Sequence, residues 1–235
     1  MIDFSAYPLD EKDLSDLAEL EIDMAFQPIF DAKDLNVVAY EALMRPAKKS
    51  PMTLIDEYQD SGKLSVIELA TYFGATHEFL RRGYSQRLCI NSLPSEALTQ
   101  GQSEAYYKSF PEMEGRVVVE IVEYTELDQD KWAAKRQDIE EHGLELAIDD
   151  YSAGNNNMDS VDYFRPSYVK LDRKLISNID THSGKQEQVV SLVKHFHQQG
   201  MKVVAEGIER KEELDYLRDV GKIDFVQGFY LGRPQ

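Results

Sequence analysis

From residue 22 to the end of the chain, short apolar runs rich in β-branched residues alternate with longer segments of helical character. This alternation restricts the fold more than any other feature of the sequence. We expect strands at 24–31, 37–44, 87–92, 116–122, 144–149, 168–172, 202–207 and 223–228. We expect helical segments at 54–82, 126–142, 186–199 and 210–220. Strands that alternate with helices are typical of a mostly parallel sheet covered by those helices.

Eight such strands within 235 residues favour an α/β fold of one kind, a TIM-like (β/α)8 barrel. An open doubly wound sheet is the alternative, but it would leave edge strands that need protection. The segment "FDAKDLN" at 30–36, which joins the first two strands, is too short for a crossover helix. We therefore expect one antiparallel strand near the N-terminus.

The first 21 residues are acidic and carry Leu14, Leu17 and Leu20 at amphipathic spacing. This pattern predicts a helical extension at 1–21, ahead of a barrel domain at 22–235. No linker or low-complexity tract divides the rest of the chain.

The charge balance bears on the partners of the protein, because 43 acidic residues stand against 26 basic ones and the formal net charge is −17. Such a balance argues against DNA bound in a basic groove, but it allows a phosphate substrate held through a metal cation. The single cysteine, Cys89, fits a reducing compartment. No apolar run reaches the roughly 20 residues of a membrane helix, and the acidic N-terminus is unlike a signal peptide. We expect a cytoplasmic protein that does not bind a membrane.

Strong polar residues stand near the carboxyl ends of seven of the expected strands. They are Glu41, Asn91, Glu120, Asp149 with Asp150, Lys170, Glu206 and Gln227. In a barrel these strand ends meet on one face, so the side chains would converge on one pocket. Crowded carboxylates need a cation, and oxygen ligands favour Mg²⁺ or Mn²⁺ over zinc. Two such ions suit in-line displacement at phosphorus, with Lys170 placed either to orient the attacking water or to neutralise charge in the transition state.

Taken singly, each of these residues has an ordinary explanation as a helix cap, a turn residue or a surface ion pair. Glu41 is harder to explain in that way, because it lies within the apolar run "VVAYEALM", where an unpaired buried carboxylate is costly. Seven coincidences on one face are less plausible than one site.

Eight motifs in order resemble the EAL-domain family of cyclic di-GMP phosphodiesterases, from about residue 22 to the end. They are "FQPIFD" (26–31), "YEALMRP" (40–46), "INSLP" (90–94), "VEIVE" (119–123), "IDD" (148–150), "VKLDR" (169–173), "VVAEGIE" (203–209) and "VQGFYLGRP" (226–234). The resemblance implies hydrolysis of cyclic di-GMP to the linear dinucleotide pGpG, in second-messenger signalling, on a (β/α) barrel with one antiparallel strand. It also implies a homodimer. Because no sensor segment fits within these 235 residues, we expect control by a separate sensor or regulatory partner, or by a separated part of a longer chain.

The resemblance assigns roles to individual residues as well. The metal ligands it implies are Glu41, Asn91, Glu120, Asp149, Asp150 and Glu206, holding Mg²⁺ or Mn²⁺, two ions per site. The catalytic residues it implies are Lys170, Glu209, Gln227 and Glu123. The substrate contacts it implies are Gln27, Leu43, Arg45 and Asp172, and the planar fork of Arg45 suits a phosphate.

Three departures from the family pattern leave alternatives open. Ser152 replaces a glycine in the loop after Asp150, and a lost glycine can forbid a left-handed backbone. Asn156 and Asn157 replace small hydroxyl residues, and asparagine tolerates left-handed backbone better than most residues. The helix that normally follows the last strand is missing from 22–235. The altered loop favours a second reading, a catalytically weak or inactive cyclic di-GMP receptor acting through protein partners. A third reading is an interaction scaffold without nucleotide.

Overall fold

The barrel begins with a β-hairpin. Strand β1 (Ile22–Asp31) runs antiparallel to β2 (Val37–Pro46), in a register that places Gln27 opposite Glu41. We describe residues 2–122, 125–152 and 156–235 of a computed structural model. The first strand is therefore reversed relative to its neighbour, as the short connection predicted.

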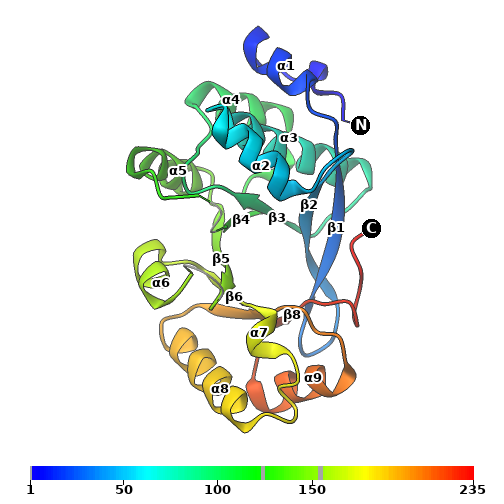
Figure 1. Cartoon of the computed structure of the whole chain (residues 1–235), viewed down its shortest axis with the longest axis vertical. Helices are drawn as coiled ribbons and strands as arrows, with labels where there is room; N and C mark the ends of the chain where they lie inside the picture. The colour runs from blue at the N-terminus through cyan, green and yellow to red at the C-terminus, as the bar shows by residue number, and fades with distance from the viewer. Residues whose placement is uncertain (1, 123–124, 153–155) are drawn as a thin grey trace.

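The remaining strands follow β2 in parallel and in sequence order around the barrel. They are β3 (Arg87–Ser92), β4 (Val117–Ile121), β5 (Glu145–Tyr151), β6 (Tyr168–Leu171), β7 (Lys202–Ala205) and β8 (Phe225–Val226). Closure depends on two residue pairs between β8 and β1, Phe30 with Val226 and Asp31 with Phe225. The prediction of a closed α/β barrel with one antiparallel strand is confirmed (Figure 1).

Helices lie outside the strands (Figure 1). They are α1 (Glu11–Ala18), α2 (Pro51–Asp60), α3 (Leu64–Arg81), α4 (Gln100–Ser109), α5 (Gln129–Glu141), α6 (Met158–Phe164), α7 (Arg173–Ile176), α8 (Ser183–Gln198) and α9 (Lys211–Tyr216). Short helical turns add η1 (Phe4–Ala6), η2 (Pro111–Met113) and η3 (Leu217–Gly221). The single helical segment expected at 54–82 was wrong, because Gly62 takes a left-handed backbone (φ 68°) and separates α2 from α3.

Inside the barrel, the side chains form two stacked rings. The lower ring is apolar and consists of Ile29, Ala39, Cys89, Val118, Ala147, Tyr168 and Val204, with Phe225 packed against it. The upper ring is polar and consists of Gln27, Glu41, Asn91, Glu120, Asp149, Lys170, Glu206 and Gln227. Each polar residue lies two positions from a lower-ring residue or Phe225 on the same strand or its direct continuation. Since strand side chains alternate between faces, both sets point inward.

The N-terminal segment packs on α3. Ile2, Phe4 and Leu17 are buried, and a Cβ on Gly74 would lie 2.9 Å from Ile2 Cδ1. Gly74 therefore lets this segment approach the helix closely. The helix predicted among the first residues is present as α1.

The C-terminal segment lies along β1 (Figure 1). Gln235 exchanges two backbone hydrogen bonds with Phe26, at 2.8 and 3.1 Å, and a Cβ on Gly232 would lie 2.6 Å from Pro28 Cγ. No helix follows β8 within 227–235, all of which the structure describes. Part of the β1 edge left open by the short β8 is thus paired with this extended segment.

Candidate active site

Lys170 occupies the centre of the upper ring. This residue is 1% exposed, and its Nζ lies 2.7 Å from Asp149 Oδ1, 2.8 Å from Glu206 Oε1 and 3.0 Å from Glu120 Oε2. Glu41 Oε2 is 3.5 Å away. One buried ammonium therefore contacts carboxylates from four strands or their ends. Burial alone would lower the pKa of Lys170, but these carboxylates raise it well above its usual value, so the side chain is charged.

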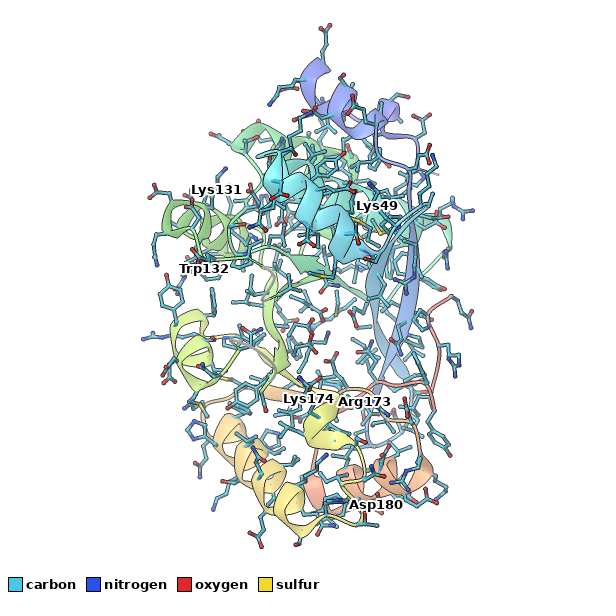
Figure 2. All side chains as sticks on the ribbon, viewed as in Figure 1. Lys49, Lys131, Trp132, Arg173, Lys174 and Asp180 are labelled. Atoms are coloured by element: carbon cyan, nitrogen blue, oxygen red, sulfur yellow. The ribbon has the colours of Figure 1, made fainter. Side chains whose placement is uncertain are left out.

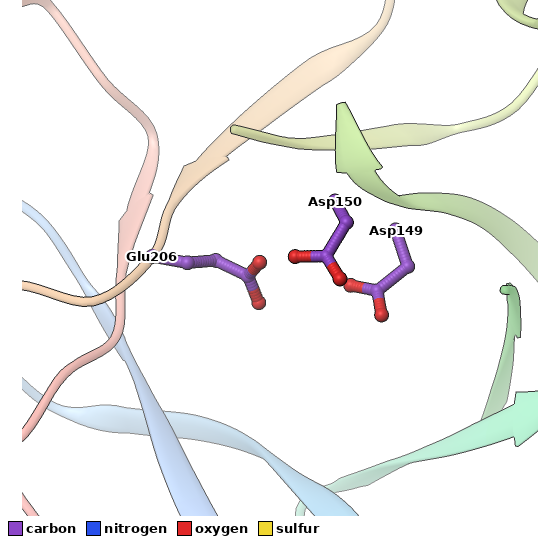
Figure 3. A group of neighbouring side chains, drawn as sticks. All are labelled: Asp149, Asp150 and Glu206. Carbon is purple, nitrogen blue, oxygen red and sulfur yellow. The ribbon is translucent and has the colours of Figure 1, made fainter. Parts of the chain in front are cut away.

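Three carboxylates gather at the carboxyl ends of β5 and β7. One oxygen each from Asp149, Asp150 and Glu206 lies within 4.8 Å of the others. Figure 3 shows the three side chains pointing toward a shared space between their strands. Groups of the same charge at this spacing repel one another unless protons or cations lie between them.

Burial and crowding raise the pKa values of these carboxyl groups. Burial, and then the Glu41 and Asp149 charges, raise the pKa of Glu120 to about 8 against the pull of Lys170. Burial and the neighbouring Asp149 raise the pKa of Asp150 to about 6. Desolvation, with Asp149 and Glu41, raises the pKa of Glu206 well above its usual value. The lysine therefore offsets only part of the negative charge of the ring.

Two amides complete the ring around Glu41. Gln227 Nε2 donates to Glu41 Oε2 at 2.7 Å, and Asn91 Nδ2 lies 3.4 Å from Glu41 Oε1 and 3.3 Å from the Ala42 carbonyl. These contacts fix the orientation of Glu41, while the side-chain oxygen of Asn91 remains a possible cation ligand.

The residues of this ring fit a hard divalent cation. Among the described residues, the buried atoms Glu120 Oε1 and Gln227 Oε1 have no hydrogen-bond partner. Buried acceptors without a donor are costly, and a cation or its bound water would satisfy them. Glu41, Asn91, Glu120, Asp149, Asp150 and Glu206 offer only oxygen and amide donors. Such a set selects Mg²⁺ or Mn²⁺ rather than a thiophilic metal.

Of the residues expected to contact substrate, Leu43 and Arg45 lie beside Asn91, and Gln27 belongs to the upper ring. Leu43, Arg45 and Asn91 line a hollow of about 160 Å³. Arg45 is exposed, and within the described chain its guanidinium makes one side-chain hydrogen bond, to the Met44 carbonyl at 3.0 Å. Gln27 is buried and donates to the Gly232 carbonyl at 3.0 Å. Arg45 is therefore open to a ligand, whereas the Gln27 amide already holds the C-terminal segment.

Three expected site residues lie outside the central cluster. Asp172 caps α7 by accepting from Lys174 N at 3.0 Å, although its charge still acts on Asp150. Glu209 is exposed and pairs with Arg173, which Figure 2 labels at the start of α7. Glu123 lies outside the described residues. A role for Asp172 or Glu209 would therefore be indirect in this arrangement.

A buried ion pair supports Asn91, and the sequence analysis missed it. Glu68 on α3 and Lys135 on α5 are 1% and 4% exposed, and Lys135 Nζ lies 3.0 Å from Glu68 Oε1. Glu68 also accepts from Ser92 Oγ at 2.5 Å and Leu93 N at 3.0 Å, directly after Asn91. The signal was available, because Glu68 lies inside the apolar stretch "VIELATYF", as Glu41 lies inside its own.

At the end of β5 and directly after it, two residues other than glycine adopt left-handed backbone. Asp150 has φ 49° and Ser152 has φ 77°. Asn157 has an extended backbone (φ −139°). Asn156 Nδ2 donates to the Asp149 carbonyl at 2.6 Å, and Ser152 N donates to the Asn156 carbonyl at 2.9 Å. These hydrogen bonds tie Asn156 to the end of β5.

Replacing Ser152 with glycine is expected to stabilise the protein by about 1 kcal/mol, because a side chain at φ 77° is strained. The free energy of unfolding in urea measures the effect. Ser152→Ala is the control, since it removes the hydroxyl but keeps the Cβ and should give no gain. Equal stabilisation by both variants would contradict backbone strain as the cause.

Protons should compete with a divalent cation for this site. Asp150 and Glu120 have pKa values of about 6 and 8 without a cation, so metal binding must displace their protons as pH falls. We expect the apparent affinity for Mn²⁺ to rise between about pH 5.5 and pH 8, by up to about tenfold per pH unit for each proton displaced. Calorimetry without nucleotide measures this. An affinity independent of pH would contradict it, and Asp150→Asn should flatten the lower part of the curve.

Among the residues that the structure describes, no helix has both the length and the apolar character needed to cross a bilayer.

The family model described as "EAL domain" matches residues 11–234. "Probable cyclic di-GMP phosphodiesterase PdeN" of Escherichia coli (strain K12) is 26% identical over 230 residues, covering 90% of this chain and 43% of that protein. The chain spans about half the length, or less, of the first curated relatives that it matches.

Solved structures share the fold. A standalone versatile EAL protein from Vibrio cholerae O395, in its c-di-GMP bound form, matches with a TM-score of 0.81 and 23% identity, over 92% of this chain and 93% of that one. The manganese/cy-diGMP complex of Klebsiella pneumoniae BlrP1 at pH 9.0 matches with a TM-score of 0.74 and 26% identity, over 92% of this chain and 56% of that one.

Proposed function

The chain belongs to the EAL domain family, and from that membership and the geometry of the upper ring we propose that it is a metal-dependent phosphodiesterase that hydrolyses cyclic di-GMP to pGpG. The observation that carries the proposal is the set of four carboxylates around one buried lysine, in a ring where the buried oxygens Glu120 Oε1 and Gln227 Oε1 lack donors among the described residues. Relatives named as cyclic di-GMP phosphodiesterases, and neighbours solved with that nucleotide, support the choice of substrate.

The proposed ligands are Glu41, Asn91, Glu120, Asp149, Asp150 and Glu206, which would hold two Mg²⁺ or Mn²⁺ ions. Bound there, the ions supply Lewis-acid activation of water and neutralise charge at the phosphorus. Support for this assignment comes from the oxygen-rich donor set and from the raised pKa values of Glu120 and Asp150.

The protein's own groups have separate tasks in the proposed reaction. Lys170, charged and 2.7 Å from Asp149, is placed to hold the attacking water by donating a hydrogen bond to its oxygen. Arg45 projects from the rim and suits a phosphate oxygen of the substrate, because its guanidinium can donate two parallel hydrogen bonds. Gln227 keeps Glu41 oriented through its 2.7 Å hydrogen bond.

One assay tests the proposal. Purified protein is incubated with cyclic di-GMP and Mg²⁺, Mn²⁺ or a chelator, and pGpG is followed by chromatography. We expect product with either ion and none with the chelator. Nucleotide that binds but stays intact for hours with both ions would refute the enzymatic function.

A receptor is the second candidate, and the left-handed Ser152 favours it. A strained loop next to Asp150 can hold a ligand carboxylate away from its catalytic position while nucleotide binding persists. Calorimetry with cyclic di-GMP, run beside the turnover assay, separates the two candidates. Homodimerisation is a further proposal that follows from the family resemblance, and control by a separate partner is one that follows from the lack of room for a sensor segment in these residues.

A further inference from the structure

The barrel interior is hollow beneath the upper ring. A cavity of about 320 Å³ lies at the opposite end of the parallel strands from the carboxylate cluster, and most of the lower ring lines it. Barrels of this kind usually fill such layers with bulky branched side chains. Here Ala39, Cys89 and Ala147 are small, so the space between the strands stays open.

The inner end of this cavity is polar. Glu120 and Lys170 line it as well as belonging to the upper ring. Glu120 is fully buried, and its Oε1 has no hydrogen-bond partner among the residues that the structure describes. A ligand that placed an N–H or O–H at the inner end would satisfy this acceptor.

The mouth of the cavity offers both signs of charge. Lys202 is exposed and lies 5.5 Å from the centre of the Phe225 ring, and within 2–122, 125–152 and 156–235 it makes no ion pair. Asp31 also lines the mouth and accepts only the Lys33 amide among the side-chain contacts described. Arg87, by contrast, is already paired with Glu145. One cation and one anion therefore remain for a ligand.

We propose that this cavity binds a free aromatic amino acid whose ring carries an N–H or O–H. Its carboxylate would meet Lys202, its ammonium Asp31, its ring the apolar lower ring, and its ring donor Glu120 Oε1. The volume falls at the lower end of the range for small-molecule pockets, about 300–1,000 Å³.

Occupancy of the cavity would couple to the site above it. Glu120 and Lys170 face both spaces, and the ring donor of the amino acid would share Glu120 Oε1 with a divalent cation, so the two ligands would weaken each other's binding by the same factor. This coupling rests on the proposed metal site, whereas the binding of the amino acid does not.

Three indoles test the two charged contacts, in calorimetry without metal or nucleotide. L-Tryptophan carries both charges, tryptamine lacks the carboxylate and indole-3-propionate lacks the ammonium. We expect L-tryptophan to bind about tenfold more tightly than either, since a hydrogen bond to a charged group contributes about 1.5–3 kcal/mol. Lys202→Gln should remove that advantage over tryptamine, and Lys194→Gln, on the exposed side of α8, should leave it intact.

Cys89 provides an independent readout, because it is the only cysteine and it lines the cavity. Burial raises the pKa of its thiol, so alkylation by iodoacetamide is slow and easily followed by intact mass. At ten times its dissociation constant, L-tryptophan should slow this alkylation about tenfold. Ala147→Leu, which fills the cavity, should abolish both binding and protection.

Absence of both heat and Cys89 protection at about 10 mM L-tryptophan would overturn the proposal. Equal affinities for the three indoles would overturn the charged contacts at the mouth. Both results are read without cyclic di-GMP, so they are distinct from a failure of the phosphodiesterase assay. If Ala147→Leu does not fold, the affinities of Lys202→Gln for L-tryptophan and tryptamine still test the proposed binding.

Discussion

Asp150→Asn is expected to lower kcat/KM for cyclic di-GMP about a hundredfold or more, a loss of about 2.7 kcal/mol in transition-state stabilisation. Asparagine has the same shape and tolerates the left-handed backbone seen at φ 49°, so the fold should be kept. What is lost is a negative charge within 4.8 Å of Asp149 and Glu206, where a cation would be held. Turnover assays and Mn²⁺ titration measure the two consequences separately.

Asp34→Asn is the matched control for this variant. Asp34 is exposed in the turn between β1 and β2, at the other end of the barrel, where it accepts from Asn36 N at 2.9 Å. Asparagine can accept the same bond, so activity should be unchanged. If Asp150→Asn stayed within about threefold of the parent protein, Asp150 would not be a ligand needed for the rate.

Glu68→Ala is expected to lower the free energy of unfolding by about 3–5 kcal/mol, because it leaves the ammonium of Lys135 buried without its carboxylate. The double variant Glu68→Leu, Lys135→Met should recover most of that loss, since an apolar pair of similar volume replaces both charges. Urea unfolding, with the slope of the transition checked for two-state behaviour, measures both variants.

Helix α5, which carries Lys135, also provides the control for the buried pair. Lys131, labelled on α5 in Figure 2, lies one turn earlier; it is partly exposed, and its Nζ is 4.0 Å from the half-buried Glu96. Lys131→Ala should change stability by no more than about 1 kcal/mol, because exposed pairs are screened by water. If Lys131→Ala lost as much free energy of unfolding as Glu68→Ala, the loss could not be attributed to the burial of an unpaired charge.

The barrel, its reversed first strand and the upper ring followed from local patterns in the sequence. Strand alternation has a period of two, so a polar residue at the carboxyl end of an apolar run could be placed inside without knowing its neighbours. Glu41, Glu120 and Lys170 were found in this way. Glu68 lies on a helix, where strand alternation does not apply; its place inside an apolar stretch marks it as buried but does not identify Lys135 as its partner.

Other features depend on contacts between residues that are far apart in the sequence, and no local sequence pattern predicts such contacts. Glu209 lies near Arg173 only because the loop after β7 approaches the start of α7. The hollow beneath the site depends on the combined volume of side chains from separate strands, and Ala39 or Ala147 alone gives no sign of it. The break between α2 and α3 was missed because one glycine inside a helical pattern is often tolerated.

The reversed first strand also decides which end of the barrel the N-terminal segment reaches. Because β1 runs opposite to β2, Ile22 pairs with Pro46 and lies on the same end of the barrel as the carboxylate cluster. In an all-parallel barrel, the residues ahead of the first strand would lie at the opposite end, about 30 Å away for a strand of this length. Here the residues directly ahead of β1 lie beside the cluster and continue into the segment that packs on α3, so a contact made with this segment acts close to the site.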